Sequence, residues 1–273
     1  MSGASAFLRR CRDAGIRCLS TTNRSSRPPG AIRDQLRGFK SLPARIDLPG
    51  VYVNHLQDVW YDGAGTLWWA HTYDLLKTDA QGNILASAVV EGHHAGLEVR
   101  GGVLYVAVCP SEGQTEVLPF SSESRLQVNE YDPETLALRA ERILDINDRA
   151  GSLAVLPDGT FVVGCLRPAG LAPDEVRFHH LTPGFKPIAS HVVKAGRQDL
   201  GIEVIRHVGD DLFLYSYTNS TRVTLDARTF APKAIEQNIA GQTGVFFAEG
   251  ATWNGITEYI PEKGGYVSRL ERA

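Results

Sequence analysis

Residues Gly92–Cys109 have the sequence GHHAGLEVRGGVLYVAVC, in which a short apolar segment and a more apolar one flank Gly101-Gly102. Two β-type segments joined by a Gly-Gly turn predict a hairpin. Similar pairs of segments recur along the chain, which indicates an internal structural repeat. The repeat sets the expected fold, and the polar residues at its start indicate where a site would lie.

Five repeats can be aligned on one position near the first strand of each. The aligned residues are spaced by 38, 56, 49 and 43 positions, and they are Asp58, Gly96, Ser152, Gly201 and Gly244. A four-stranded propeller blade takes about 40–50 residues. The first repeat places its four expected strands at 59–61, 67–71, 75–79 and 84–89, with turn residues between them.

The last repeat supplies only three strands, whereas Ala44–Leu48 forms an isolated strand before the first repeat. Pairing this strand with the last repeat would close the ring and remove its sheet edges. We therefore expect an all-β fold, a five-bladed β-propeller of four-stranded antiparallel blades whose last blade is closed by an N-terminal strand. A sixth blade would have to come from residues 1–42, whose composition argues against one.

Residues 1–42 differ in composition from residues 43–273, which we expect to form the propeller domain. The first segment has eight arginines, only two acidic residues, clusters of serine and threonine, and Pro28-Pro29. This composition suits a flexible basic arm, an organelle-targeting segment or a wrongly assigned start. The compartment is therefore left open, with the cytoplasm as the default.

The totals of the 273-residue chain bear on its partners. Its formal net charge is −3, and it has no apolar run of about 18 residues. We therefore expect neither a nucleic-acid partner nor a membrane association. Four cysteines are too few for a disulfide framework in a chain of this size, so free thiols are expected. A closed propeller needs no second copy, and we expect a soluble monomer.

Two kinds of sequence motif in the repeats resemble those of known propellers. Segments 62–69 (DGAGTLWW) and 79–84 (DAQGNI) resemble the blades of the superfamily that includes the NHL, SMP-30/gluconolactonase and strictosidine-synthase-like groups. Segment 131–136 (YDPETL) is similar to a phrase of the bacterial and plant glutamine cyclotransferases, which are five-bladed propellers. The resemblance covers residues 44–273 and implies the fold. It implies no activity, because the chain lacks the spaced Glu, Asn and Asp ligands of a typical gluconolactonase and the opening motif of a cyclotransferase.

The first strand of each blade lines the central channel of a propeller, so the residues just before that strand surround one mouth. In the aligned repeats the polar residues at this place are His55, His93, His94, Arg149, Gln198 and Asp199. Glu98 and Glu203 follow in the strands, and we expect them deeper along the channel or in its wall. His71 ends a second strand on the same face, and the long loops 110–124 and 167–175 would cover this mouth.

Imidazoles, carboxylates and covering loops at one mouth favour an enzyme that acts on a small polar metabolite, as a hydrolase, lyase or isomerase. We expect catalytic roles for His55, His93, His94 and Arg149, and substrate binding by Gln198, Asp199, Glu98, Glu203 and His71. Two mechanisms stay open. His55, His93 and Asp199 could hold one divalent metal ion, or a histidine could act as general base while Arg149 stabilises negative charge.

Each of these assignments has a structural alternative. His55 and His93 would satisfy loop backbone groups, and Glu98 and Glu203 would bond neighbouring blades. Cys109 and Cys165 are expected to be buried apolar residues rather than nucleophiles. Four further histidines are interpreted as surface residues: His179, His180, His191 and His207. For the whole protein, the alternative is a non-catalytic propeller that binds a sugar, peptide or protein partner.

Overall fold

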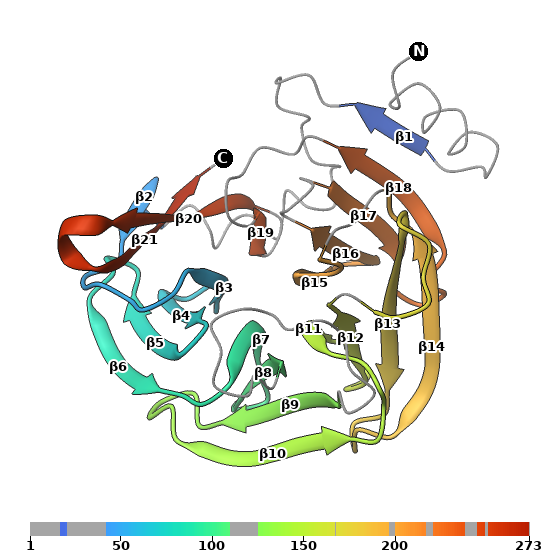
Figure 1. Ribbon diagram of the computed structural model, residues 1–273, viewed down its shortest axis with the longest axis horizontal. Helices are drawn as coiled ribbons and strands as arrows, with labels where there is room; N and C mark the ends of the chain where they lie inside the picture. The colour runs from blue at the N-terminus through green and yellow to red at the C-terminus, as the bar shows by residue number, and fades with distance from the viewer. Residues whose placement is uncertain are drawn as a thin grey trace.

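The structure is a computed structural model that describes residues 17–20, 42–109, 125–166, 168–196, 200–216, 221–237, 245–248 and 251–272. Figure 1 shows five sheets arranged as a ring around a central axis. The expected five-bladed β-propeller is therefore confirmed. In the described part of the chain, no helix is long and apolar enough to cross a membrane.

Each blade is built from strands that run in order from the axis outward. Blade 1 contains β3 (Leu56–Tyr61), β4 (Thr66–His71), β5 (Asp74–Asp79) and β6 (Ile84–Val89). Blade 2 contains β7 (His93–Arg100), β8 (Val103–Cys109), β9 (Leu126–Tyr131) and β10 (Leu138–Leu144). Blade 3 contains β11 (Ala150–Val155), β12 (Phe161–Cys165), β13 (Glu175–Leu181) and β14 (Pro187–Lys194). Blade 4 contains β15 (Val204–Val208), β16 (Asp211–Ser216), β17 (Thr221–Asp226) and β18 (Pro232–Gln237). Blade 5 contains β19 (Val245–Ala248), β20 (Ala251–Ile260), β21 (Gly265–Arg272) and β2 (Arg45–Asp47).

The apolar core lies between the faces of neighbouring blades. The inner strand β11 is buried along its whole length, whereas the outer strands β6 and β10 are exposed or half-buried throughout. Aromatic side chains fill the space between blades 2 and 3, where Tyr105 meets the ring of Phe161 edge-on at 4.9 Å between centroids. Phe161 in turn stacks on Phe185 at 4.4 Å. The inner strands contact one another in cyclic order, which fixes the ring.

A recurring turn joins the third and fourth strands of blades 2 and 4. The carboxylates of Asp132 and Asp226 accept hydrogen bonds at 2.8–3.0 Å from the backbone N–H groups two and three residues later. Four residues after each aspartate, Leu136 and Phe230 adopt φ angles of 59° and 58°. This left-handed backbone is costly for a bulky residue, but it buries both side chains. The sequence motif YDPETL thus forms a structural turn between the third and fourth strands of its blade.

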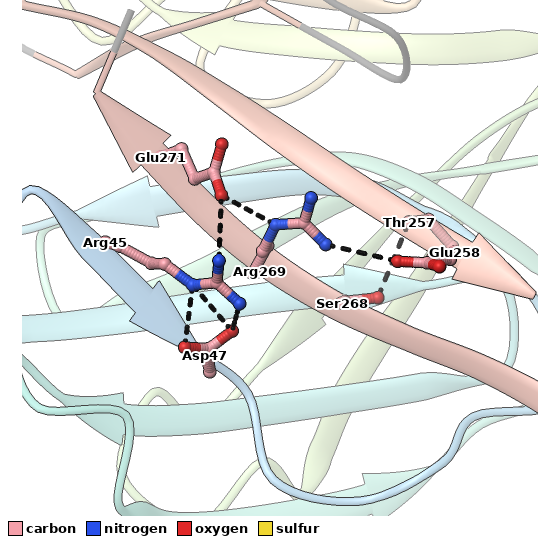
Figure 2. Close-up of polar contacts among 7 residues, drawn as sticks. All are labelled: Arg45, Asp47, Thr257, Glu258, Ser268, Arg269 and Glu271. Atoms are coloured by element: carbon pink, nitrogen blue, oxygen red, sulfur yellow. Dashed lines mark hydrogen bonds and ion pairs between the residues drawn. The ribbon is translucent and has the colours of Figure 1, made fainter. Parts of the chain in front are cut away.

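The strand β2 closes the ring as expected from the sequence. It pairs antiparallel with β21, with Arg45 opposite Glu271 and Asp47 opposite Arg269, and the intervening Ile46 is only 2% exposed. Figure 2 shows the charged groups along this seam: Arg45 binds Asp47 and lies 3.4 Å from Glu271, whose carboxylate also accepts from Arg269 at 2.7 Å. Exposed ion pairs of this kind contribute little, so strand pairing and burial of Ile46 are the main stabilising contacts.

A fifth strand on blade 4 was not expected from the sequence. β1 (Arg17–Ser20) pairs in parallel with the outer strand β18, with Cys18 opposite Ile235 (Figure 1). Part of the basic N-terminal segment therefore lies along the outer edge of the propeller.

Candidate functional site

A buried ion pair joins the inner strands of two blades. Arg206 on β15 is 1% exposed, and its guanidinium binds the carboxylate of Asp58 on β3, which belongs to a blade that is not its neighbour. The same guanidinium donates to the carbonyl oxygens of Val59 at 2.8 Å and Ile205 at 2.7 Å. The pair thus links the inner strands of blades 1 and 4 across the ring.

Polar side chains of the inner strands also bind the backbone of the next blade. Asp58 accepts from the N–H of Leu97 at 2.9 Å, and Glu98 accepts from the N–H of Val155 at 3.0 Å. Ser152 continues the pattern toward blade 4, since its hydroxyl oxygen lies 2.8 Å from the nitrogen of Ile205. For Glu98 this geometry matches the structural alternative, a bond between blades. Burial raises its pKa to about 7, against the backbone hydrogen bond and the charge of Arg206.

His93 lies at the start of β7, opposite Cys109 at the end of β8. Its side chain is 7% exposed. Burial, together with the neighbouring His55 and His94, lowers the pKa of His93 to about 4. None of the described residues forms a hydrogen bond with this imidazole. His93 is therefore a neutral ring at pH 7, close to His55, with nitrogen atoms that the described structure leaves available.

His55 is half-buried and held by its own segment of chain. Its Nδ1 lies 2.9 Å from Oδ1 of Asn54, and its Nε2 lies 2.8 Å from the amide nitrogen of Gln57. Because the Gln57 amide donates, Nε2 accepts and the proton sits on Nδ1, which donates to Asn54. Burial lowers the pKa of His55. This second imidazole is thus neutral and fixed in orientation.

His94 and His71 lie within the blades. His94 is fully buried, and its Nε2 lies 2.5 Å from the hydroxyl of Tyr131, the last residue of β9. His71 is also fully buried, stacks on Tyr52 at 4.1 Å between centroids and places Nε2 3.0 Å from Oγ of Ser268. Burial lowers the pKa of His71 to about 3 and that of His94 to about 4. Of the expected histidines, His55 and His93 thus remain the candidates for contact with a ligand.

Arg149 is 6% exposed and lies in the segment that leads into β11. Burial raises the pKa of the Cys109 thiol, and the positive charge of Arg149 opposes this shift. The guanidinium of Arg149 therefore lies near Cys109, which is the cross-strand partner of His93. Glu203 is 7% exposed, and its backbone N–H donates to the carbonyl of Tyr215 at 2.9 Å. Gln198, Asp199 and the loop 110–124 lie outside the described residues.

A second polar cluster lies in blade 3, where the sequence predicted a surface. The interpretation of His179 as a surface residue is wrong: it is 7% exposed, and its Nε2 lies 2.8 Å from Oδ2 of Asp148. The buried Cys165 completes a group of three potential metal ligands whose donor atoms all lie within 4.8 Å of one another. His179 and His180 are consecutive residues of β13, so their side chains point to opposite faces of the sheet. The side chain of His179 is buried and that of His180 is half-buried. The sequence alone does not say which one faces the core.

A small cavity opens between blades 3 and 4, away from His55 and His93. Its volume is about 10 Å³, room for about one water molecule, and its lining is mostly apolar, with Ile202, Leu214 and Val223 among the lining residues. Small-molecule sites begin at about 300 Å³, so this cavity is too small to be the substrate pocket.

No protein-family model and no curated protein matches this chain. Solved structures match its fold. A glutaminyl cyclase from Myxococcus xanthus superposes with a TM-score of 0.50 and 15% identity, over 83% of this chain and 95% of its own. A putative exported protein from Bacteroides fragilis gives a TM-score of 0.48 at 11% identity, over 92% of this chain and 80% of its own. A chain of a nidogen–laminin complex gives 0.44 at 11% identity, over 68% of this chain and 64% of its own. The chain therefore shares the propeller fold with glutaminyl cyclase, at an identity that shows the fold alone.

Proposed function

We propose that this propeller is an enzyme that acts on a small polar metabolite at the mouth of its central channel, beside His55, His93 and Arg149. The observation that carries the proposal is the imidazole of His93, which is nearly buried and has no hydrogen-bond partner among the described residues. Buried polar groups normally have partners. A nearly buried group without one, with a perturbed pKa and beside a second imidazole, is typical of a position that receives a ligand.

The charges at this mouth favour a substrate with a carboxylate or a polarised carbonyl. Arg149 supplies the positive charge that would bind such a group. The neutral ring of His93 would accept a hydrogen bond or a proton from the substrate, or from a water molecule beside it. An anion bound next to His93 would raise its pKa from about 4 toward neutrality, which is the range in which a general base works best. Proton transfer next to a stabilised oxyanion serves hydrolysis, elimination and isomerisation.

A divalent metal ion is the second form of this proposal. His93 has nitrogen atoms available, but the Nε2 atom of His55 is engaged by Gln57, so an ion would have to displace that amide. The expected third ligand, Asp199, lies outside the described residues. Within the described part of the mouth the donors are therefore two imidazoles, which is one ligand short of a typical catalytic site. An ion bound there would polarise a carbonyl or activate water.

The test is turnover of a panel of lactones, esters and hydroxy acids that can undergo elimination. For a compound that is turned over, we expect His93→Ala to lower kcat/KM at least about 100-fold, and His55→Ala together with His93→Ala to lower it no less. His207→Gln is the matched control. This half-buried histidine lies near the C-terminal end of the inner strand β15, whereas the mouth lies at the start of the inner strands. Unchanged turnover in the double variant would refute the proposal.

Metal content separates the two forms of the mechanism. Protein purified without a histidine tag is analysed for metal before and after a chelator, alongside the double variant. One equivalent of metal that the wild-type protein holds before chelation, and that the double variant lacks, would favour the metal-assisted form. If no compound of the panel binds or turns over, the non-catalytic binding module becomes the better interpretation.

A further inference from the structure

Three side chains of different chemistry meet inside blade 3. Asp148 lies in the connection from β10 to β11, Cys165 ends β12, and His179 lies in β13. They are 2%, 0% and 7% exposed, and their donor atoms all lie within 4.8 Å of one another. We propose that this triad binds a divalent cation of the zinc class, at a site separate from the mouth of the channel.

The donor set selects the kind of ion. A thiolate sulfur, an imidazole nitrogen and a carboxylate oxygen are the three ligand types that zinc takes in proteins, usually in tetrahedral geometry. Magnesium and calcium are bound by oxygen ligands, so a site with one carboxylate, one sulfur and one nitrogen disfavours them. Three protein ligands leave one tetrahedral position for a water molecule or another small group.

The contacts around Asp148 show how the ion would be accommodated. Asp148 accepts from Nε2 of His179 at 2.8 Å and from Nη1 of Arg177 at 3.1 Å. Burial raises the pKa of Cys165 well above its usual value, and the carboxylate of Asp148, which accepts a hydrogen bond from the thiol, raises it further. Without an ion, one carboxylate therefore organises a thiol, an imidazole and a guanidinium.

Binding changes these contacts in a balanced way. The Cys165 thiol loses its proton to solvent and the sulfur binds the ion as thiolate. His179 changes tautomer: Nε2 gives up to solvent the proton that it donates to Asp148, Nδ1 takes one up from solvent, and the lone pair of Nε2 binds the ion. The thiolate and the Asp148 carboxylate offset the two charges of the ion. Arg177 keeps its contact with Asp148 and orients that ligand from outside, as partners of metal ligands commonly do.

The position of the triad gives the ion a structural role. Asp148 belongs to the connection from blade 2, whereas Cys165 and His179 belong to neighbouring strands of blade 3. An ion bound to all three would fasten the connection between two blades to the sheet that follows it. The expected consequence of loading is a more stable propeller.

The test uses the full chain without a histidine tag, stripped with a chelator and then titrated with zinc, cobalt or magnesium. We expect one equivalent of zinc per chain, and an unfolding temperature raised by about 5 °C when free zinc is 100-fold above its Kd. Magnesium should give no shift. Cobalt should produce a thiolate-to-metal charge-transfer absorption, which reports directly on a sulfur ligand.

Variants assign the ligands. Cys165→Ser should abolish the charge-transfer absorption, and His179→Gln should weaken cobalt and zinc binding at least about tenfold. Cys109→Ser is the matched control, since it removes the other described buried cysteine and should leave the absorption intact. The double variant His55→Ala, His93→Ala should also keep it, which separates this site from the mouth.

Two results would overturn the proposal: no charge-transfer absorption in the wild-type chain, or an absorption that survives in Cys165→Ser. The wild-type measurement decides the question even if Cys165→Ser does not fold.

Discussion

His71 is a histidine whose protonation should limit stability at acid pH. It is fully buried, it stacks on Tyr52, and its Nδ1 has no hydrogen-bond partner in the described part of the chain. Burial lowers its pKa to about 3, whereas an unfolded histidine has a pKa of about 6.5. The unfolded state therefore binds the proton first. The stability due to neutral His71 is complete above pH 6.5 and is lost as the pH falls toward 3.

Replacing His71 tests the direction of this pH dependence of stability. Between pH 7 and pH 5, protonation of the unfolded state at this position should cost about 2 kcal/mol of unfolding free energy. We expect His71→Gln to reduce the difference in unfolding free energy between these two pH values by about that amount, measured by urea denaturation. Ser268→Ala is the control, because it removes the hydrogen-bond partner and keeps the titrating ring. An unaltered pH dependence in His71→Gln would contradict the argument.

At the scale of residues, the aligned repeats predicted the neighbourhood of a side chain better than its direction. His55 and His93 do lie close enough for charge on one to lower the pKa of the other. His94 turns instead to Tyr131, and the strand pairing shifts register between His94 and Leu97. A one-residue shift in a strand exchanges its faces, and the sequence does not reveal such a shift. Whether His55 and His93 act on a substrate stays a prediction.

Gly96 shows how closely neighbouring elements approach at the axis. A Cβ atom added to Gly96 of β7 would lie 2.2 Å from Oγ and 2.7 Å from Cα of Ser152 on β11. The second distance involves backbone, which cannot move without separating two inner strands. Gly101, in the β7–β8 turn, has a φ of +56° and no atom within 4 Å of such a Cβ. The two glycines therefore serve different needs, close packing at Gly96 and backbone conformation at Gly101.

We expect Gly96→Ala to lower the unfolding free energy by about 3 kcal/mol through overpacking. Gly101→Ala should cost only about 1–2 kcal/mol, the penalty of a left-handed backbone for alanine. Urea denaturation of both variants beside the wild type measures the difference. Equal losses would show that the close approach of β7 and β11 at Gly96 accommodates a methyl group without the extra cost of overpacking.

The order of strands was predictable at the scale of elements because each blade repeats the same turn chemistry. Gly101-Gly102 and the Asp132 turn mark where strands end, and both stand plainly in the sequence. The pairing of β1 with β18 was not predictable. It is a four-residue parallel contact at an outer edge, formed by a segment whose composition gives no strand signal. Edge pairing needs only backbone groups, so the pattern of side chains in the sequence does not predict it.

The whole ring depends on how its two ends meet. Blade 5 takes three strands from the C-terminal end of the chain and its fourth, β2, from the N-terminal side (Figure 1). Leu42, Ile46 and Leu48 are each at most 4% exposed and belong to one apolar cluster with Trp253 and Leu270. Burying one such side chain contributes about 1.5–3 kcal/mol, and the total stability of a domain is only about 5–15 kcal/mol. Loss of this short segment should therefore threaten the entire fold.

Two truncations of the chain test the closure. Removing residues 1–41 keeps β2 and its apolar neighbours, and we expect a cooperative unfolding transition as in the full chain. Removing residues 1–49 takes away β2 and leaves the edge of β21 unpaired, which should lower stability by at least about 4 kcal/mol and promote association through the open edge. Urea denaturation and size-exclusion chromatography measure both effects, and an added peptide spanning residues 42–50 should partly restore the shorter chain. If the two truncated proteins were equally stable and monomeric, the propeller would hold together without its N-terminal strand, and β2 would not be needed to close the ring.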